Sequence, residues 1–411
     1  MSDTRESLIT WCKTNGVKGY SGKKKEDLIR MVEEAKKEQK EQKEQKETKE
    51  QEVLDKKESS ISQNSYAVLS LFTGMGGMDL GFAEQVVVHR QSVQEVDIDH
   101  VNTPTPNFVA LKRHPFHVVF QNDILPIAQK VAEWNHWNHH YHLRDIRELL
   151  EEKFEFPAAE VVIGGFPCQD FSHAGKRKGF DSQRGTLYQA YVEVVRRVQP
   201  LVFVAENVNG LLTMPGEPIR QIVTDFSAVG YDVKYQLIKC EEYGIPQTRW
   251  RVIIMGVRRD KVGSLPEDWN IIPVSHLRCP LRSYFQHLEE PDVTDDAAQK
   301  IYSKAARLEK GQGQKEVNLD EFAPTMRAEH HGNIEFRRIH AGENNEQGHD
   351  LKERRLTLRE AALIQTFPPQ CILTETKRPS SAAYKPIGNA VPPLLGYIIA
   401  KKVKWILGLI Q

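Results

Sequence analysis

One cysteine of the chain stands in a setting that suits covalent chemistry. Cys168 follows the apolar run 161–163, the pair Gly164 and Gly165, and Pro167. Glycine allows close backbone approaches that a side chain would block, and proline stiffens a loop. A thiol on a tight loop at the end of a strand can attack a molecule bound above the sheet edge. A lone cysteine is more often an inert buried hydrophobe, so the assignment depends on what else meets it.

The elements that must position this thiol are predicted from hydrophobic runs. Five runs predict strands, at 67–72, 86–89, 116–120, 161–163 and 201–205, and helical patterns such as 187–198 separate some of them. This alternation predicts an α/β fold with a doubly wound, mostly parallel sheet. Ligands of such sheets bind at the carboxyl ends of the strands. Other polar or glycine-rich groups fall there too: Phe72 to Gly77, Glu95, Asp97, Asp123, Glu206 and Asn207.

The glycine-rich loop after the first strand suits a nucleoside cofactor. A glycine loop lets the backbone approach a ligand closely, and the N-terminus of a helix follows it. Glu95 stands about twenty residues later, where an acidic residue would hold ribose hydroxyls. Asp79 departs from the Gly-x-Gly-x-x-Gly spacing, which disfavours a dinucleotide with its pyrophosphate. A purely structural turn is the alternative.

Composition excludes several classes of protein. The 411 residues contain 56 basic and 56 acidic side chains, so net charge points to no partner. Five scattered cysteines without a Cys-x-x-Cys pair argue against structural zinc and against a disulfide framework. Their odd number and a polar N-terminus predict an intracellular, non-secreted protein, and no apolar run reaches membrane-spanning length. Four histidines at 136–142 interleave with tryptophans, which favours an exposed insertion over a metal site.

The chain divides by composition into five segments. Residues 1–32 predict a small helical module and 33–65 a charged linker rich in Lys, Glu and Gln. Residues 66–256 predict the catalytic and cofactor-binding domain. Residues 257–353 lack strong periodicity, and 354–411 are expected to complete the catalytic domain.

Six sequence blocks together resemble the cytosine-5 DNA methyltransferase family, which uses S-adenosylmethionine. They are Phe72-x-Gly74-x-Gly76-Gly77, Pro167-Cys168-Gln169, Glu206-Asn207-Val208, Gln247-Thr248-Arg249-Trp250-Arg251, Arg355-Leu356-Thr357 through Gln365-Thr366-Phe367-Pro368, and Gly388-Asn389-Ala390-Val391-Pro392. The resemblance covers 66–400 apart from a variable segment, and it implies the Rossmann-like fold of class I methyltransferases.

The resemblance implies a covalent mechanism on a cytosine flipped out of a short double-stranded DNA site. Cys168 matches the nucleophile that adds to carbon 6, and Glu206 matches the acid at ring nitrogen 3. Arg251 matches the residue that binds the exocyclic oxygen. Arg249 is expected to order neighbouring loops, and Gln169 belongs to the catalytic loop.

The resemblance also implies a cofactor site. Phe72 would lie near the adenine, Gly74 and Met75 along the methionine portion, and Glu95 at the ribose. The full expected set is Phe72, Gly74, Met75, Gly76, Gly77, Glu95, Val96, Asp123, Ile124, Pro167, Asn389 and Val391. No metal is expected.

DNA contacts are implied in three places. A glycine-containing basic loop resembles the mobile catalytic loop of the family, the segment 257–353 occupies the position of its target-recognition domain, and the N-terminal module resembles a SAP-type DNA-binding module. The residues are Ser172, Lys176, Arg177, Lys178, Arg184, Gln247, Thr325, Lys23 and Lys24.

Three other functions are alternatives for such a chain. A transfer-RNA substrate is disfavoured because none of the five cysteines precedes Phe-Thr. A regulator without catalysis is disfavoured by Cys168, Glu206 and Arg251, and a nucleotide-dependent oxidoreductase by the glycine spacing. We expect a monomer whose partner is double-stranded DNA, with a cognate restriction endonuclease as a functional rather than physical partner. Cytoplasm, nucleus and viral factory stay open as locations.

Overall fold

The computed structural model describes residues 4–15, 17–35, 37, 65–167, 186–304, 316–328, 336–337 and 354–410. Its residues form two compact units, 1–64 and 65–411. In the first unit, helix α1 (Arg5–Thr14) begins at the N-cap Thr4 and packs Leu8 and Cys12 against Leu28 and Val32 of a helix at 25–35. The turn between the helices contains two glycines with positive φ, Gly19 and Gly22, a conformation that glycine adopts without strain.

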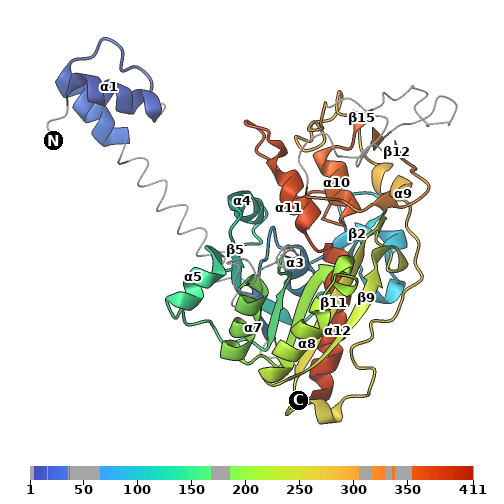
Figure 1. Cartoon of the computed structure of the whole chain (residues 1–411). Coiled ribbons are helices and arrows are strands. Elements are labelled where there is room, and N and C mark those ends of the chain that lie inside the picture. Colours follow the sequence, from blue (N-terminus) through green and yellow to red (C-terminus); the bar gives the residue numbers. More distant parts are fainter. Residues whose placement is uncertain are drawn as a thin grey trace. The chain divides into compact units, whose positions relative to one another are not determined.

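A seven-stranded sheet organises the second unit (Figure 1). Its strand order is β6-β5-β1-β7-β8-β11-β9, and β11 alone runs antiparallel to its neighbours. The bounds are β1 Tyr66–Leu71, β5 Phe116–Asp123, β6 Tyr141–Leu143, β7 Val161–Gly164, β8 Val202–Val208, β9 Tyr231–Lys239 and β11 Trp250–Arg258. The central strands read as continuous apolar runs because both faces of the sheet are covered.

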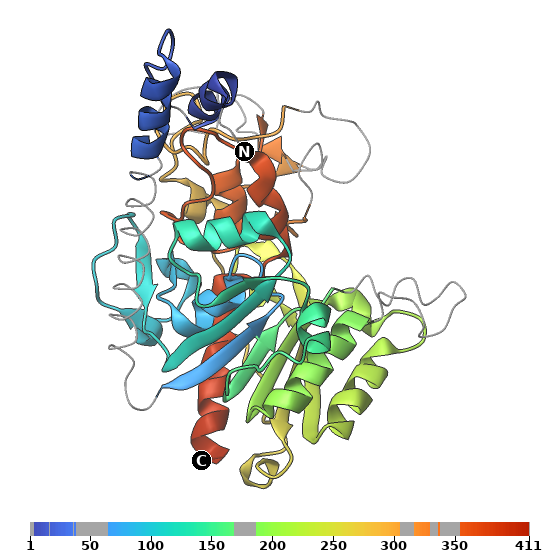
Figure 2. The same cartoon turned by 90° about the vertical axis from the view of Figure 1, so that its left-hand side faces the viewer.

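Helices cover the two faces of this sheet (Figure 2). On one face, α3 (Gly77–Ala83) and α12 (Pro393–Ile410) pack on a core that includes Val68, Ile163 and Val204. On the other, α5 (Ile146–Glu151), α7 (Thr186–Val198) and α8 (Pro218–Ala228) pack on Leu69, Val162 and Phe203. This alternation follows from the two-residue period of a strand. The fold is the predicted α/β arrangement.

The segment between α3 and β5 departs from the expected strand order. The predicted strand at 86–89 forms β2 (Val87–His89), which pairs with β4 (Phe108–Leu111) in an antiparallel sheet completed by β3 (Ile98–Asp99). It therefore does not belong to the main sheet, where the neighbour of β1 is β5. The expectation of an exposed insertion at the histidine-rich segment was also wrong in part, because this segment supplies β6 at the sheet edge.

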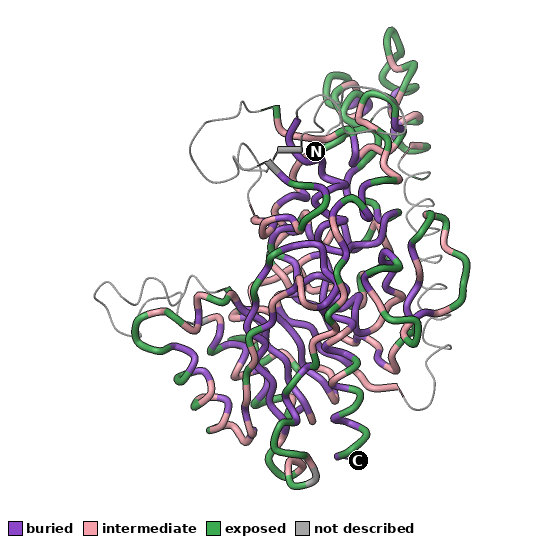
Figure 3. Tube along the Cα trace, turned by 90° about the vertical axis from the view of Figure 1, so that its right-hand side faces the viewer, coloured by how far each residue is buried: buried purple, intermediate pink, exposed green. Residues whose placement is uncertain are grey.

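A third core lies beyond the main sheet. Helices α4 (Pro126–Trp134), α9 (Leu281–Phe285), α10 (Leu358–Ile364) and α11 (Tyr384–Asn389) contribute to it. In Figure 3 the buried trace runs through the main sheet and continues into this region. The short strands are β10 Gln247–Thr248, β12 Glu316–Val317, β13 Ala323–Pro324, β14 Phe336–Arg337 and β15 Arg354–Arg355. The 3-10 turns are Arg90–Ser92, Glu95–Asp97, Asn209–Leu212, Cys240–Glu242, Val262–Ser264 and Ser381–Ala383.

A membrane-spanning helix is not found in the parts of the chain that the structure describes, since none of those helices is both long and apolar enough.

Candidate active site

A cavity of about 490 Å³ lies at the carboxyl ends of the parallel strands, where the fold predicts a ligand. Its volume falls in the range of small-molecule sites. Each strand end contributes a short segment to the wall: 72–74 after β1, 123–125 after β5, 145–147 after β6, 165–167 after β7 and 206–208 at the end of β8. Residues 388–391, far away in the sequence, close the opposite side.

The glycine loop is held by the end of the neighbouring strand. The N–H of Gly74, which has a positive φ, donates to Oδ2 of Asp123 at 2.8 Å. Oδ1 of Asp123 accepts from the N–H groups of Ile124 and Leu125, and the Tyr141 hydroxyl donates to the Gly74 carbonyl. Burial raises the pKa of Asp123, and these backbone donors oppose that shift. The two strand ends therefore form one fixed wall of the cavity.

A second carboxylate, that of Asp79, connects the glycine loop to two strands of the sheet through hydrogen bonds. Asp79 is 3% exposed and accepts from Ser70 Oγ (3.0 Å), Thr73 Oγ1 (2.8 Å) and Gln121 Nε2 (2.9 Å). Burial raises the pKa of Asp79. The residue that breaks the dinucleotide spacing thus joins β1, the glycine loop and β5.

Glu206 and Arg251 meet at the wall of the cavity across the β8–β11 pair. Nε of Arg251 lies 2.7 Å from Oε1 of Glu206, and each side chain is 10% exposed. The N–H is not aligned on this oxygen, so among the described residues Oε1 has no hydrogen-bond donor. A buried acceptor without a donor is costly unless another molecule supplies one. A Cβ at Gly165 would come within 2.9 Å of Glu206 Oε2, so glycine gives this carboxylate its room.

Arg249 lines the first cavity and also connects three segments of the chain. It is 1% exposed, and its guanidinium donates to the carbonyls of Met326 (3.0 Å), Gly388 (3.1 Å) and Ala390 (3.0 Å). Burial, reinforced by Arg251, lowers the pKa of Arg249 to about 9. The side chain orders the loops at the far wall of the cavity.

The DNA contact expected for Gln247 does not fit the structure. Gln247 is fully buried, and its amide bonds the Ile364 carbonyl, Gln365 Oε1 and the Met326 N–H. This buried side chain instead joins Met326 to the C-terminal end of α10. Thr325, in contrast, is accessible and donates to the Thr248 carbonyl at 2.7 Å.

The expected cofactor residues separate into three groups. Phe72, Gly74, Asp123, Ile124, Pro167, Asn389 and Val391 line the cavity. Met75, Gly76 and Gly77 lie outside its lining. Met75 is fully buried, and a Cβ at Gly77 would lie 2.2 Å from the Val391 carbonyl oxygen.

Glu95 and Val96 do not lie where the sequence predicts them, at the cofactor cavity. Both lie outside the cavity lining; Glu95 pairs with Arg90 at an exposed site, and Val96 is 64% exposed. The physical reason is topological, because β2 leaves the main sheet and the strand beside β1 is β5. Its terminal carboxylate is Asp123.

Several predicted residues fall outside the described residues. They are Cys168, Gln169, Ser172, Lys176, Arg177, Lys178 and Arg184. Pro167, which precedes Cys168, does line the cavity.

Other side chains of the lining were missed from the sequence. Asp145, Ile146 and Arg147 follow β6, and Lys385 comes from α11. An acidic residue followed by isoleucine stands near the end of both strands, Asp123-Ile124 at β5 and Asp145-Ile146 after β6. The polar sequence of β6 does not predict a strand, so the second pair has no strand end to mark it. Among described residues, no cluster of three or more His, Cys, Asp or Glu side chains could hold a metal.

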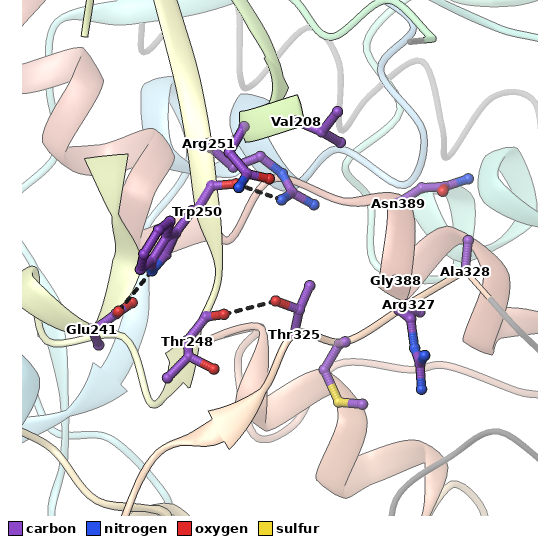
Figure 4. A pocket seen from close by; sticks show the side chains of 12 residues that line it. Val208, Glu241, Thr248, Trp250, Arg251, Thr325, Arg327, Ala328, Gly388 and Asn389 are labelled. Atoms are coloured by element: carbon purple, nitrogen blue, oxygen red, sulfur yellow. Dashed lines mark hydrogen bonds between the residues drawn. The ribbon is translucent and has the colours of Figure 1, made fainter. Parts of the chain in front are cut away.

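A second cavity, of about 630 Å³, continues beyond Arg251 (Figure 4). Trp250 and Glu241 lie on one side of it, Arg327 and Asn389 on the other, and Thr248 and Thr325 between them. It shares Val208, Arg251, Gly388 and Asn389 with the first cavity. The two spaces therefore meet at Arg251, the partner of Glu206.

The comparison with protein families is decisive. The family model described as C-5 cytosine-specific DNA methylase matches residues 66–405. The chain belongs to the C-5 cytosine-specific DNA methylase family. It is an enzyme that methylates DNA on carbon 5 of cytosine, and the methyltransferase family implies S-adenosylmethionine as the methyl donor.

Relatives of this methylase family cover most of the chain. Type II methyltransferase M.BspRI of Lysinibacillus sphaericus is 33% identical over 376 residues, which cover 85% of this chain and 84% of the relative. Type II methyltransferase M.BsuRI of Bacillus subtilis is 31% identical over 361 residues, covering 82% and 78%. These names support a restriction-modification setting.

Solved structures confirm the fold. The DNMT2 mutant of Spodoptera frugiperda superposes with a TM-score of 0.55 at 16% identity, covering 82% of this chain and 99% of the other. The Dnmt2 methyltransferase of S. pombe gives 0.54 at 20% identity, covering 84% and 98%.

Proposed function

We propose that this methylase acts through a transient bond between Cys168 and carbon 6 of a cytosine that has left its duplex. The observation that carries the proposal is the Glu206–Arg251 pair, with a buried carboxylate oxygen that lacks a donor. The protonated N3 of a cytosine adduct, or its amino group, supplies such a donor. Arg251 offers N–H groups to the exocyclic oxygen beside it.

Cys168 would supply the nucleophile from the loop that follows Pro167. Its thiolate adds to carbon 6, and the electron pair of the 5,6 double bond moves into the ring. Glu206 donates a proton or a hydrogen bond at N3, where the negative charge develops. This makes carbon 5 nucleophilic, and loss of its proton at the end expels the thiolate and restores the double bond.

S-adenosylmethionine, when bound, supplies an electrophilic methyl group. The first cavity suits it in size and in its polar groups. Ile124 is 62% exposed at the cavity and offers an apolar surface to an adenine ring. We assign the ribose hydroxyls to Asp123 in place of Glu95, because Asp123 ends the strand next to β1. Phe72, Gly74, Asn389 and Val391 complete the cofactor wall.

DNA would approach from the side of the second cavity. Base extrusion costs a few kcal/mol, which contacts to the displaced nucleotide must offset. We assign target recognition to 257–353, with Thr325 at the extruded nucleotide, and phosphate contacts to the basic loop 172–184. Lys23 and Lys24 of the N-terminal SAP-like module would bind phosphates without sequence preference. A cognate restriction endonuclease would be its functional partner.

The test is a covalent trap. The protein is incubated with S-adenosylmethionine and duplex DNA in which 5-fluorocytosine replaces cytosine, then denatured and run on a gel. Wild type is expected to stay attached to DNA, because fluorine cannot leave carbon 5 as a proton does.

Cys168→Ser is expected to abolish turnover and the attached band while still binding DNA. An attached band or residual methylation in that variant contradicts the covalent mechanism. Parallel assays with RNA test the substrate class, and bisulfite sequencing of DNA from expressing cells maps the methylated site.

A further inference from the structure

Trp250 occupies an unusual place for a large aromatic side chain. It is the first residue of β11, it lines the second cavity, and it is 40% exposed. Its successor, Arg251, lines both cavities and pairs with Glu206. Neighbouring residues on a strand point to opposite faces, and here both reach the same space because the strand begins at its wall (Figure 4).

The indole is held in one orientation. Nε1–H of Trp250 donates to Oε1 of Glu241 at 2.9 Å. Lys239, its cross-strand partner, places Nζ 5.2 Å from the ring centroid, within the range of a cation–π contact. The ring is therefore fixed in place before any ligand arrives.

Stability does not account for this arrangement. The ring contributes to none of the buried cores, and within the part of the chain that is described, Oε2 of Glu241 is buried without a hydrogen-bond donor. Such an oxygen costs free energy. Glu241 lacks one hydrogen-bond donor and holds an exposed indole in a fixed orientation. Both features are typical of a preorganised binding surface.

We propose that Trp250 is a positioning residue that forms the aromatic wall against which the extruded nucleotide of the target strand packs. This rests on the proposed function, since it takes the Glu206–Arg251 end of the cavity as the place of the target cytosine. A nucleotide that leaves the duplex loses its stacking partners, and an aromatic side chain replaces them for any base or sugar. Lys239 beside the ring and Arg327 across the cavity place positive charge near its phosphates.

The chain offers a matched control. Trp405 on α12 is 42% exposed, and Nζ of Lys402 lies 3.8 Å from its ring centroid. It lines neither cavity. Truncation of Trp405 removes a ring of the same kind, exposure and cationic neighbour without touching the proposed nucleotide path.

The experiment compares Trp250→Ala, Trp250→Phe and Trp405→Ala, using a duplex oligonucleotide that carries the site mapped by bisulfite sequencing. Trp250→Ala is expected to weaken DNA binding and raise KM for DNA roughly tenfold or more. Binding of S-adenosylmethionine, measured by calorimetry without DNA, should not change. Trp250→Phe should recover most of the loss, and Trp405→Ala should behave as wild type.

A fluorescence measurement gives an independent readout. Addition of the duplex should quench indole emission in wild type and in Trp405→Phe, but much less in Trp250→Phe. Equal quenching in the three proteins, or equal DNA affinity of Trp250→Ala and Trp405→Ala, would overturn the assignment. DNA affinity and indole emission are both measured without turnover, so failure of the covalent trap and failure of this inference are distinguishable.

Discussion

The chemistry at the residue scale centres on one carboxylate whose surroundings leave it incompletely bonded. Nε of Arg251 lies 2.7 Å from Oε1 of Glu206, but among the residues that the structure describes no donor is aligned on this oxygen. The Glu206 carboxylate need not reorient when substrate arrives, because the ion pair with Arg251 already sets its orientation. Preorganised polar groups of this kind stabilise charge that develops during a reaction.

Glu206→Gln should slow the chemical step by roughly two or more orders of magnitude, because an amide cannot protonate the ring. The change keeps the size of the side chain, so binding of DNA should be retained. Single-turnover methyl transfer at saturating DNA measures the step directly. A rate within a factor of about three of wild type would contradict the role of Glu206 as an acid.

Gly165→Ala tests whether the position of that carboxylate matters as much as its chemistry. The new Cβ would come 2.9 Å from Glu206 Oε2 and push the side chain aside. A misplacement of about 1 Å can cost about a hundredfold in rate, whereas the free energy of unfolding should change by no more than about 1 kcal/mol. Gly263→Ala is the control, because a Cβ there meets nothing. Full activity of Gly165→Ala would show that Glu206 tolerates movement.

At the scale of elements, the site is assembled from strand ends and from one returning segment. Arg249 on the link between β10 and β11 bonds three carbonyls of two other segments. A planar guanidinium can serve several carbonyls at fixed angles, whereas an ammonium cannot. The far wall of the cavity therefore depends on a buried side chain whose hydrogen bonds go to the protein's own carbonyls.

Arg249→Lys should lower the free energy of unfolding by about 2 kcal/mol or more, since it leaves buried carbonyls without donors. Urea denaturation measures the change. Arg196→Lys serves as control, because Arg196 forms a solvent-exposed pair with Glu193, and exposed pairs contribute little to stability. Equal stability of the two variants would mean that the buried carbonyls find other donors.

The sequence predicted most strands of the main sheet because they are apolar throughout. It misplaced β2, since periodicity identifies a strand without saying which strand it pairs with, and the spacing rule then selected Glu95 instead of Asp123. It also missed three strands of the main sheet, β6, β9 and β11; the residues of β6 are half-buried at the sheet edge and include a histidine. The Arg249 contacts join residues up to 141 positions apart and leave no local pattern.

The whole molecule consists of two units joined by a charged segment in the sequence. The first unit has its own small core of Leu8, Cys12, Leu28 and Val32. Tethering a second binding module raises the effective concentration of DNA near the active site. Its role is therefore expected in binding and not in turnover.

Deletion of residues 1–60 should weaken DNA binding, mostly at low salt, and leave turnover at saturating DNA intact. A full-length variant with Lys23→Gln and Lys24→Gln is the matched control, and it should reduce the slope of log affinity against log salt by about one for each lost phosphate contact. Binding isotherms at several salt concentrations measure both. Identical affinity and slope in the deletion would remove any DNA-binding role from the module.

The close approach of α3 and α12 has a consequence for biosynthesis. A Cβ at Gly81 would lie 2.1 Å from the amide nitrogen of Tyr397, so the two helices touch backbone to backbone. The glycine loop emerges early from a ribosome, yet its covering helix and residues 388–391 emerge only after some 300 more have been added. A growing chain therefore cannot close this cavity until residues 388–391 have been added, and a product terminated before them is expected to be inactive.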